Sequence, residues 1–206
     1  MHDVPGFYGK APARGDFVSR RMPKDFVATW DTWLQTLLTE STSRLGDGWL
    51  AAWLEAPVWH FTFGRGVAAL EPAIGVLIPS VDRVGRHFPF SILGLCRDDG
   101  MPPELWAPRI EQLALGALDD GFDPEILDHD LAALGPPRDV VGLPAALPPL
   151  GWSPRTGADC WRIADAGETI WWCRTTARVP AATLRAEGLP APADSAWLIA
   201  GPDLAG

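Results

Sequence analysis

The sequence predicts an α/β protein: a single domain over residues 1–206, built as a three-layer α/β/α sandwich with helices on both sides of a central mixed sheet. Three observations predict this class. Helical patterns lie between groups of strand-like runs along the chain. The run 74–79 is continuously apolar, as expected of a strand that is buried on both faces. A hairpin expected over 159–174 needs antiparallel neighbours, so the sheet should be mixed rather than all parallel.

The chain is expected to open on a short strand and to continue with a long helix. The strand covers VPGFYG at 4–9, and residues 10–22 are polar and irregular. Pro23 suits the first position of a helix that ends in the Ser/Thr-rich stretch before Gly46. The apolar residues of this helix recur at helical spacing and should form one buried face: Phe26, Trp30, Trp33, Leu34, Leu37 and Leu38.

A short second helix is expected at 48–55, followed by three strands. The first strand, 58–63, is rich in β-branched and aromatic residues. After a glycine turn, the second strand is the apolar run 74–79. The polar loop Ser80–His87 then leads into a third strand at 88–96.

Two further helices are expected, at 104–119 and at 125–134. Each has one apolar face, and Asp123 with Pro124 is a good start for the second. The segment 135–158 holds six prolines and is interpreted as a Pro-rich surface loop.

Beyond this loop, strands are expected to resume. They should cover 159–164 and 169–174, joined by a turn at 165–167. A short helix is expected after Pro180, and a last strand at 195–200.

Charge and composition exclude several classes of function. The formal net charge is −9, which argues against nucleic acid or an anionic membrane as the main partner. No run approaches the ~20 apolar residues that span a bilayer, and the N-terminus has no apolar signal core. The three cysteines form no CxxC pair, so neither a zinc site nor a disulfide framework is indicated. We therefore expect a soluble cytoplasmic protein with no metal and no cofactor.

Enzyme motifs are weak. Gly64-x-Gly66-x-x-Ala69 resembles a dinucleotide fingerprint, but Pro72 interrupts the helix that such a site needs. Ser80, Asp82 and His87 could be imagined as a triad, yet there is no Gly-x-Ser-x-Gly turn around the serine. We expect no enzyme here. The alternative is an enzyme or small-ligand-binding module with a site near the Ser80–His87 loop.

Two glycine-flanked segments, 6–17 and 79–89, concentrate charge between strongly apolar neighbours. They could bind a partner protein, or they could only tie down the ends of strands, with Asp16 or Asp82 pairing an arginine internally. Their candidate partner-binding residues are Lys10, Arg14, Asp16, Asp82, Arg83 and Arg86.

The same segments resemble the TagF (ImpM-like) family of type VI secretion proteins over roughly residues 5–93. The similarity is carried by three stretches: Gly6 to Phe17 (GFYGKAPARGDF), Trp30 to Leu34 (WDTWL), and a loop with Pro79, Ser80, Asp82, Gly85, Arg86, Phe88 and Pro89. The resemblance implies an α/β sandwich and a post-translational regulator, commonly a repressor. It also implies a forkhead-associated scaffold protein as partner, alongside a threonine kinase and phosphatase pathway. It carries over no catalytic residues.

The function expected from the sequence is therefore protein binding rather than catalysis. A cytoplasmic regulator would bind a secretion component through the charged residues named above. Most of the eleven tryptophans should be core residues, and an exposed one should anchor the interface.

Overall fold

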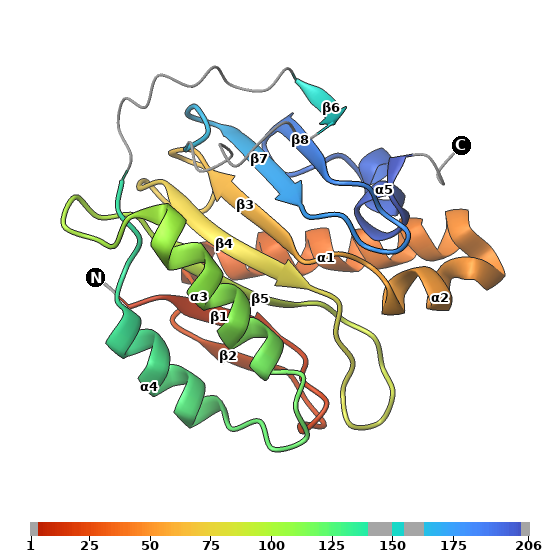
Figure 1. The fold of residues 1–206 in the computed structure, drawn as a ribbon, viewed down its shortest axis with the longest axis horizontal. Coiled ribbons are helices and arrows are strands. Elements are labelled where there is room, and N and C mark those ends of the chain that lie inside the picture. The colour runs from red at the N-terminus through yellow and green to blue at the C-terminus, as the bar shows by residue number, and fades with distance from the viewer. Residues whose placement is uncertain (1–3, 140–149, 155–162, 203–206) are drawn as a thin grey trace.

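Eight strands form one sheet in the computed structural model, which describes residues 4–139, 150–154 and 163–202 (Figure 1). Their order is β2-β1-β5-β4-β3-β7-β8-β6, and every pair of neighbouring strands is antiparallel. The prediction of a mixed sheet is therefore wrong, and the class is α+β. The strands are β1 (Gly6–Gly9), β2 (Val18–Arg20), β3 (Trp59–Phe63), β4 (Ala73–Ile78), β5 (Phe90–Leu95), β6 (Gly151–Pro154), β7 (Glu168–Cys173) and β8 (Ala182–Glu187).

Five α-helices accompany this sheet among the described residues. They begin and end close to where the sequence predicts for the first four: α1 (Lys24–Leu45), α2 (Trp49–Leu54), α3 (Pro103–Gly116), α4 (Pro124–Leu134) and α5 (Ser195–Ala200). The expected start of α4 is confirmed, because the Asp123 side chain accepts a hydrogen bond from Glu125 N at 3.0 Å.

The central strand β4 explains why the sheet carries apolar side chains on both sides. All six of its residues are buried, as its continuous apolar run predicts. Alternate residues point to opposite faces: Ala73 and Leu77 join one hydrophobic cluster, while Ile74 and Val76 join the other.

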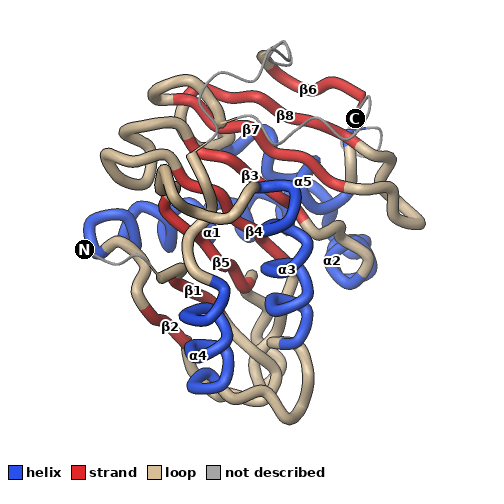
Figure 2. The backbone as a smooth tube through the Cα atoms, turned by 60° about the vertical axis from the view of Figure 1, so that its left-hand side comes forward, coloured by secondary structure: helices blue, strands red, loops and turns tan. Residues whose placement is uncertain are grey.

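Helices contribute to both clusters. Residues of α1, α2 and α5 belong to the cluster of Ala73 and Leu77, and residues of α3 and α4 to that of Ile74 and Val76. Figure 2 shows α3 and α4 together, near the β1–β5–β4 part of the sheet. Because these two helices cover only part of their face in the described structure, a complete three-layer sandwich stays a prediction.

The C-terminal third differs most from expectation. The helix predicted after Pro180 is the strand β8, and the strand predicted at 195–200 is the helix α5. The Pro-rich segment 135–158 holds an edge strand, β6, although 140–149 and 155–158 lie outside the described residues. Of the predicted 159–174 hairpin, the second strand is present as β7, which pairs with β3 and β8, and residues 159–162 of the first strand lie outside the described residues. Near the N-terminus, β2 lies within a segment expected to be irregular.

Candidate functional site

The predicted charged residues meet at one end of the sheet, where β1 ends and β4 and β5 are joined. Lys10 follows β1 directly, and Asp82 lies in the connection from β4 to β5. The Lys10 Nζ lies 3.0 Å from Asp82 Oδ2, and both side chains are buried. Lys10 therefore links two segments 72 positions apart in the sequence.

Residues Val81–His87 form a tight turn, which we call the arginine turn. Val81 and His87 pair as an antiparallel bridge, and Asp82 N donates to Arg86 O at 3.0 Å. Gly85 has φ +85, a left-handed conformation that glycine adopts without the clash that a Cβ brings. The turn is thus closed by its own backbone.

Asp82 is the centre of this turn. Its Oδ1 accepts hydrogen bonds from Val84 N at 3.0 Å and from Arg86 N at 2.9 Å, and its Oδ2 accepts from Arg86 Nε at 2.6 Å. Burial alone would raise the pKa of Asp82. The hydrogen bonds from the Arg86 backbone, Lys10, the Arg86 side chain and Val84 outweigh burial, so this pKa lies well below the ordinary value of 3.8.

The segment before β2 packs against the arginine turn. Arg83 N donates to Arg14 O at 2.9 Å, and the Arg86 guanidinium donates to Gly15 O at 2.7 Å. The Phe17 and Phe88 rings meet edge to face. The Lys10 ammonium lies over the Phe17 ring, 5.1 Å from the centre of that ring. The two charged segments predicted from the sequence therefore form one surface.

The six predicted residues divide into two groups. Lys10 and Asp82 are buried and pair with each other, which the sequence did not predict; Asp82 also pairs with Arg86, as the structural interpretation of the loops predicted. The other four are exposed: Arg14, Asp16, Arg83 and Arg86.

These exposed residues differ in their contacts. Asp16 Oδ1 accepts from Phe17 N, and Arg14 reaches Phe122 O and Asp123. Within the described chain, the Arg83 side chain makes no ion pair; its guanidinium lies over Gly15.

Sequence reasoning missed the apolar part of this surface. Val84, at the tip of the turn, is 67% exposed, and Phe17 is 41% exposed. Both residues lie inside the charged segments 6–17 and 79–89, and this position in the sequence is the signal that could have identified them. Nothing in the sequence indicated that Arg14 would reach Phe122 and Asp123.

Ser80, Asp82 and His87 do not form a relay. The Ser80 hydroxyl donates to Lys10 O at 2.8 Å, and Asp82 is engaged by Lys10 and Arg86. The His87 ring packs edge-on against Trp49 and Trp53. Each of the three groups is therefore committed to a separate contact.

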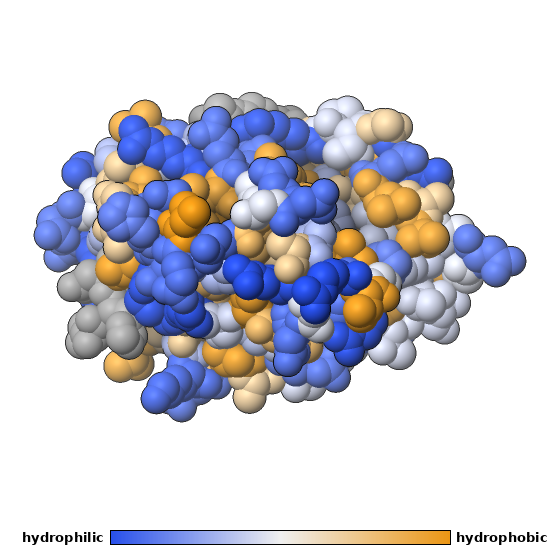
Figure 3. Space-filling view, turned by 90° about the horizontal axis from the view of Figure 1, so that it is seen from below, coloured by the Kyte–Doolittle hydropathy of each residue, from blue (hydrophilic) through white to orange (hydrophobic). Residues whose placement is uncertain are grey.

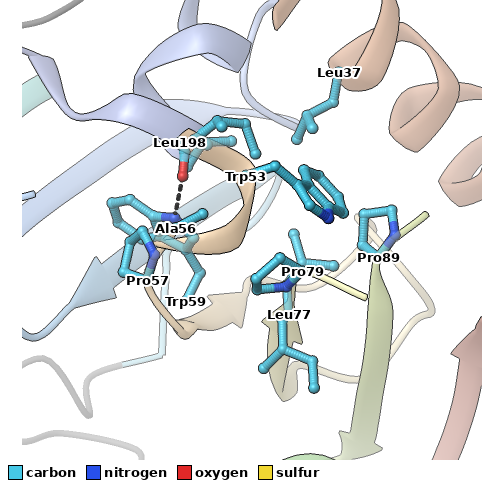
Figure 4. A pocket seen from close by; sticks show the side chains of 11 residues that line it. Leu37, Trp53, Ala56, Pro57, Trp59, Leu77, Pro79, Pro89 and Leu198 are labelled. Carbon is cyan, nitrogen blue, oxygen red and sulfur yellow. Dashed lines mark hydrogen bonds between the residues drawn. The ribbon is translucent and has the colours of Figure 1, made fainter. Parts of the chain in front are cut away.

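A small apolar pocket lies beside the turn, under α2 and α5 (Figure 4). Trp53, Pro79 and Pro89 line it together with Trp59, whose indole N–H donates to Leu198 O at 2.7 Å. Its volume is about 10 Å³, no more than one water molecule occupies. This pocket lacks the room and the converging polar groups of a substrate site.

The expectation of an exposed tryptophan anchor is wrong for the described residues. Seven tryptophans are buried, and Trp49, Trp152 and Trp197 are partly buried; Trp161 lies outside the described residues. The exposed large apolar side chains are instead mostly aliphatic. The face seen in Figure 3 is largely hydrophilic with separate hydrophobic patches.

Two features of the described residues bear on other classes of function. No group of three or more His, Cys, Asp or Glu side chains among them is placed to hold a metal ion. None of the helices found in them has the length and apolar character needed to cross a membrane.

Comparison with known proteins agrees with the resemblance seen in the sequence. The family model described as "TagF N-terminal domain, Type VI secretion system-associated" matches residues 6–134. The crystal structure of PA0076 from Pseudomonas aeruginosa PAO1 is similar with a TM-score of 0.74 and 33% sequence identity, over 96% of this chain and 94% of that one. No curated protein matches the sequence.

The family model covers the three stretches that carry the resemblance, including the arginine turn and the segment that packs against it. The similarity to PA0076 extends over nearly the whole of both chains. This chain is a member of the TagF family of type VI secretion system-associated proteins.

Proposed function

We propose that this protein is a cytoplasmic regulator, acting as a repressor, of a type VI secretion system, and that it works by binding another secretion protein. The partner we favour is a forkhead-associated scaffold protein, in a system controlled by a threonine kinase and phosphatase. The contact surface is the arginine turn with Arg14 and Asp16 beside it.

The observation that carries this proposal is the rigid presentation of Arg83 and Val84. The buried Lys10–Asp82 pair and the backbone hydrogen bonds to Asp82 hold the turn in one shape. A pre-ordered turn loses little conformational entropy on binding, which favours affinity. Arginine beside an exposed apolar side chain is typical of the residues that contribute most to protein interfaces.

The six residues then have two roles. Lys10 and Asp82 position the turn from inside, while Arg14, Asp16, Arg83 and Arg86 face the partner. An enzyme or small-ligand module near Ser80–His87 is the less favoured alternative, because Ser80, Asp82 and His87 make separate contacts and the neighbouring pocket is small and apolar.

Co-expression with the forkhead-associated protein of the same secretion system tests the proposal. Arg83→Ala should reduce co-purification of that protein at least about tenfold, since a central interface arginine contributes on the order of 2 kcal/mol. Overproduction of the wild-type chain should lower secretion through the system, and overproduction of Arg83→Ala should not.

Lys24→Ala provides the matched control. Lys24 is an exposed cation beside the 66–71 turn, which precedes β4, whereas the arginine turn follows β4 at its other end. Its removal should leave co-purification unchanged. Full recovery of the partner by a folded Arg83→Ala variant would contradict the proposed interface.

A further inference from the structure

A second surface is formed where α3 and α4 lie side by side, and it adjoins the first surface at the Arg14–Asp123 ion pair (Figures 1 and 2). Two adjoining hollows of about 310 and 290 Å³ follow the two helices. Both are lined by Gln112, Leu113 and Asp130, so they form one continuous groove, which we call the α3–α4 groove.

Small residues keep this groove open. Gly116 lines it from α3, and a Cβ built there meets no atom within 4 Å. Ala133 lines the opposite end from α4. The larger residues of both helices, such as Ile110 and Leu131, are buried towards the sheet and hold the helices in place.

The groove has an apolar floor. Leu127 is buried within it, and Leu113 and Leu134 are partly buried. Ile126 rises at its side and is 62% exposed. Together these side chains leave apolar surface uncovered along about two helical turns, since the lining of α3 runs from Arg109 to Gly116.

Charge identifies the kind of partner. Residues 103–134 contain eight Asp or Glu and one Arg, and four of these carboxylates pair with cations from elsewhere in the chain: Glu111 with Arg174, Asp123 with Arg14, Glu125 with Arg20 and Asp128 with Arg21. Asp119, Asp123 and Asp130 line the groove, and among the described residues neither Asp119 nor Asp130 makes an ion pair. Of the residues that line the groove, Arg109 alone is a cation, and it lies at the end away from Asp119; Arg14 pairs with Asp123 from outside the lining.

We infer that the α3–α4 groove binds a basic amphipathic helix of a partner protein. Apolar side chains spaced by one helical turn would occupy the floor over Leu113 and Leu127, beside Ile126, and flanking Lys or Arg would pair with Asp119 and Asp130. The positive N-terminal end of that helix would lie at the Asp119 end, and its C-terminal end near Arg109.

A labelled synthetic peptide serves as the probe: an amphipathic helix of Leu and Lys, compared with the same pattern of Leu and Glu. Fluorescence anisotropy with the full chain should show binding of the Leu/Lys peptide and at least about tenfold weaker binding of the Leu/Glu peptide. Equal affinity for the two peptides would overturn the inference.

Gly116→Phe and Asp130→Lys separate the groove from general attraction between opposite charges. Gly116→Phe fills the groove without changing any charge, so it should weaken Leu/Lys binding about as much as Asp130→Lys. Leu105→Ala, an exposed apolar position of α3 outside the groove lining, should not weaken it.

Far-UV circular dichroism checks that each variant is folded. Binding of the Leu/Lys peptide that survives in folded Gly116→Phe would show adventitious charge attraction and would refute the groove. Because Arg83 plays no part in this binding, Arg83→Ala should bind the peptide normally, so the two proposed surfaces can fail independently.

Discussion

At the scale of single residues, the buried pair Lys10–Asp82 shows how a charged motif serves the fold. Both side chains are removed from water. Removing Asp82 would leave the Lys10 ammonium as an uncompensated buried charge, whereas Asp82 also pairs with Arg86 at 2.6 Å. The Asp82 carboxylate accepts its other hydrogen bonds from the Arg86 side chain and from the backbone N–H groups of Val84 and Arg86. The exposed Arg83 depends on this arrangement for its position.

Asp82→Asn should lower the free energy of unfolding by about 3 kcal/mol, because it leaves Lys10 buried without a counter-charge. Chemical denaturation measures this change. Asp16→Asn, at an exposed carboxylate, should change stability by no more than about 0.5 kcal/mol. Equal effects of the two substitutions would mean that the buried pair contributes nothing of its own.

Asp82 also predicts a dependence of stability on pH. Its folded pKa is depressed, so the unfolded chain takes up this proton first as pH falls. The stabilisation is complete above the unfolded pKa of about 4 and is lost progressively below it. Between pH 5 and pH 3, wild type should lose more stability than Asp82→Asn, as measured by urea denaturation at each pH. Parallel losses would contradict this assignment.

At the scale of elements, the packing of β4 sets a strict limit on its side chains. Gly75 lies between β3 and β5, and a Cβ there would approach the Phe61 ring to 2.2 Å and Ile92 O to 2.6 Å. Gly116 at the end of α3 has no such neighbour. The two glycines therefore should respond in opposite ways to the same substitution.

Gly75→Ala should destabilise the protein by about 1–3 kcal/mol through overpacking. Gly116→Ala should stabilise it by up to about 1 kcal/mol, because alanine is the better helix former. Thermal melts of the two variants against wild type measure both effects. A melting temperature for Gly75→Ala at or above that of wild type would show that Phe61 moves aside freely.

The elements also show where sequence patterns suffice. The α1 stripe of Phe26, Trp30 and Leu34 repeats over many turns, so its period is unambiguous. The helix α5 has only six residues, too few to display a period, and its Trp-Leu-Ile run is equally typical of a strand. β8 is made largely of helix-forming residues, but pairing with β7 and β6 overrides that preference.

The candidate site was predictable to a similar degree. Its six charged residues stand out locally, and the pairing of Asp82 with an arginine was expected from their closeness in the chain. The role of Lys10 could not be found in this way, because it depends on which strands become neighbours: β1 pairs with β5, next to β4. Strand order is a property of the whole sheet, and no local pattern encodes it.

At the scale of the whole molecule, residues beyond the family match complete the fold. The match ends at residue 134, yet the whole length of β3 pairs with β7, and Trp171 packs against Trp30 and Trp33. The indole N–H of Trp33 donates to Pro190 O at 2.8 Å. The N-terminal part therefore relies on the C-terminal part for its core.

A fragment of residues 1–134 should consequently fail to form a soluble monomer. Without β7, the apolar strand β3 becomes an open sheet edge, which favours aggregation. Size-exclusion chromatography and thermal melting of the fragment and the full chain test this. A monomeric fragment with a cooperative melt would show instead that the chain is divisible, contrary to the predicted single domain.

The burial of the Lys10–Asp82 ion pair has an evolutionary consequence. A lineage that replaces the aspartate first leaves the lysine as a buried unpaired charge and must pass through a poorly folded intermediate, so the lysine should be lost before the aspartate or together with it. Relatives that have lost the aspartate should therefore carry an uncharged residue in place of the lysine. In such relatives Arg83 would no longer be held in position and its codon would accumulate substitutions. Loss of this arginine would then mark branches that recognise their partner through other residues.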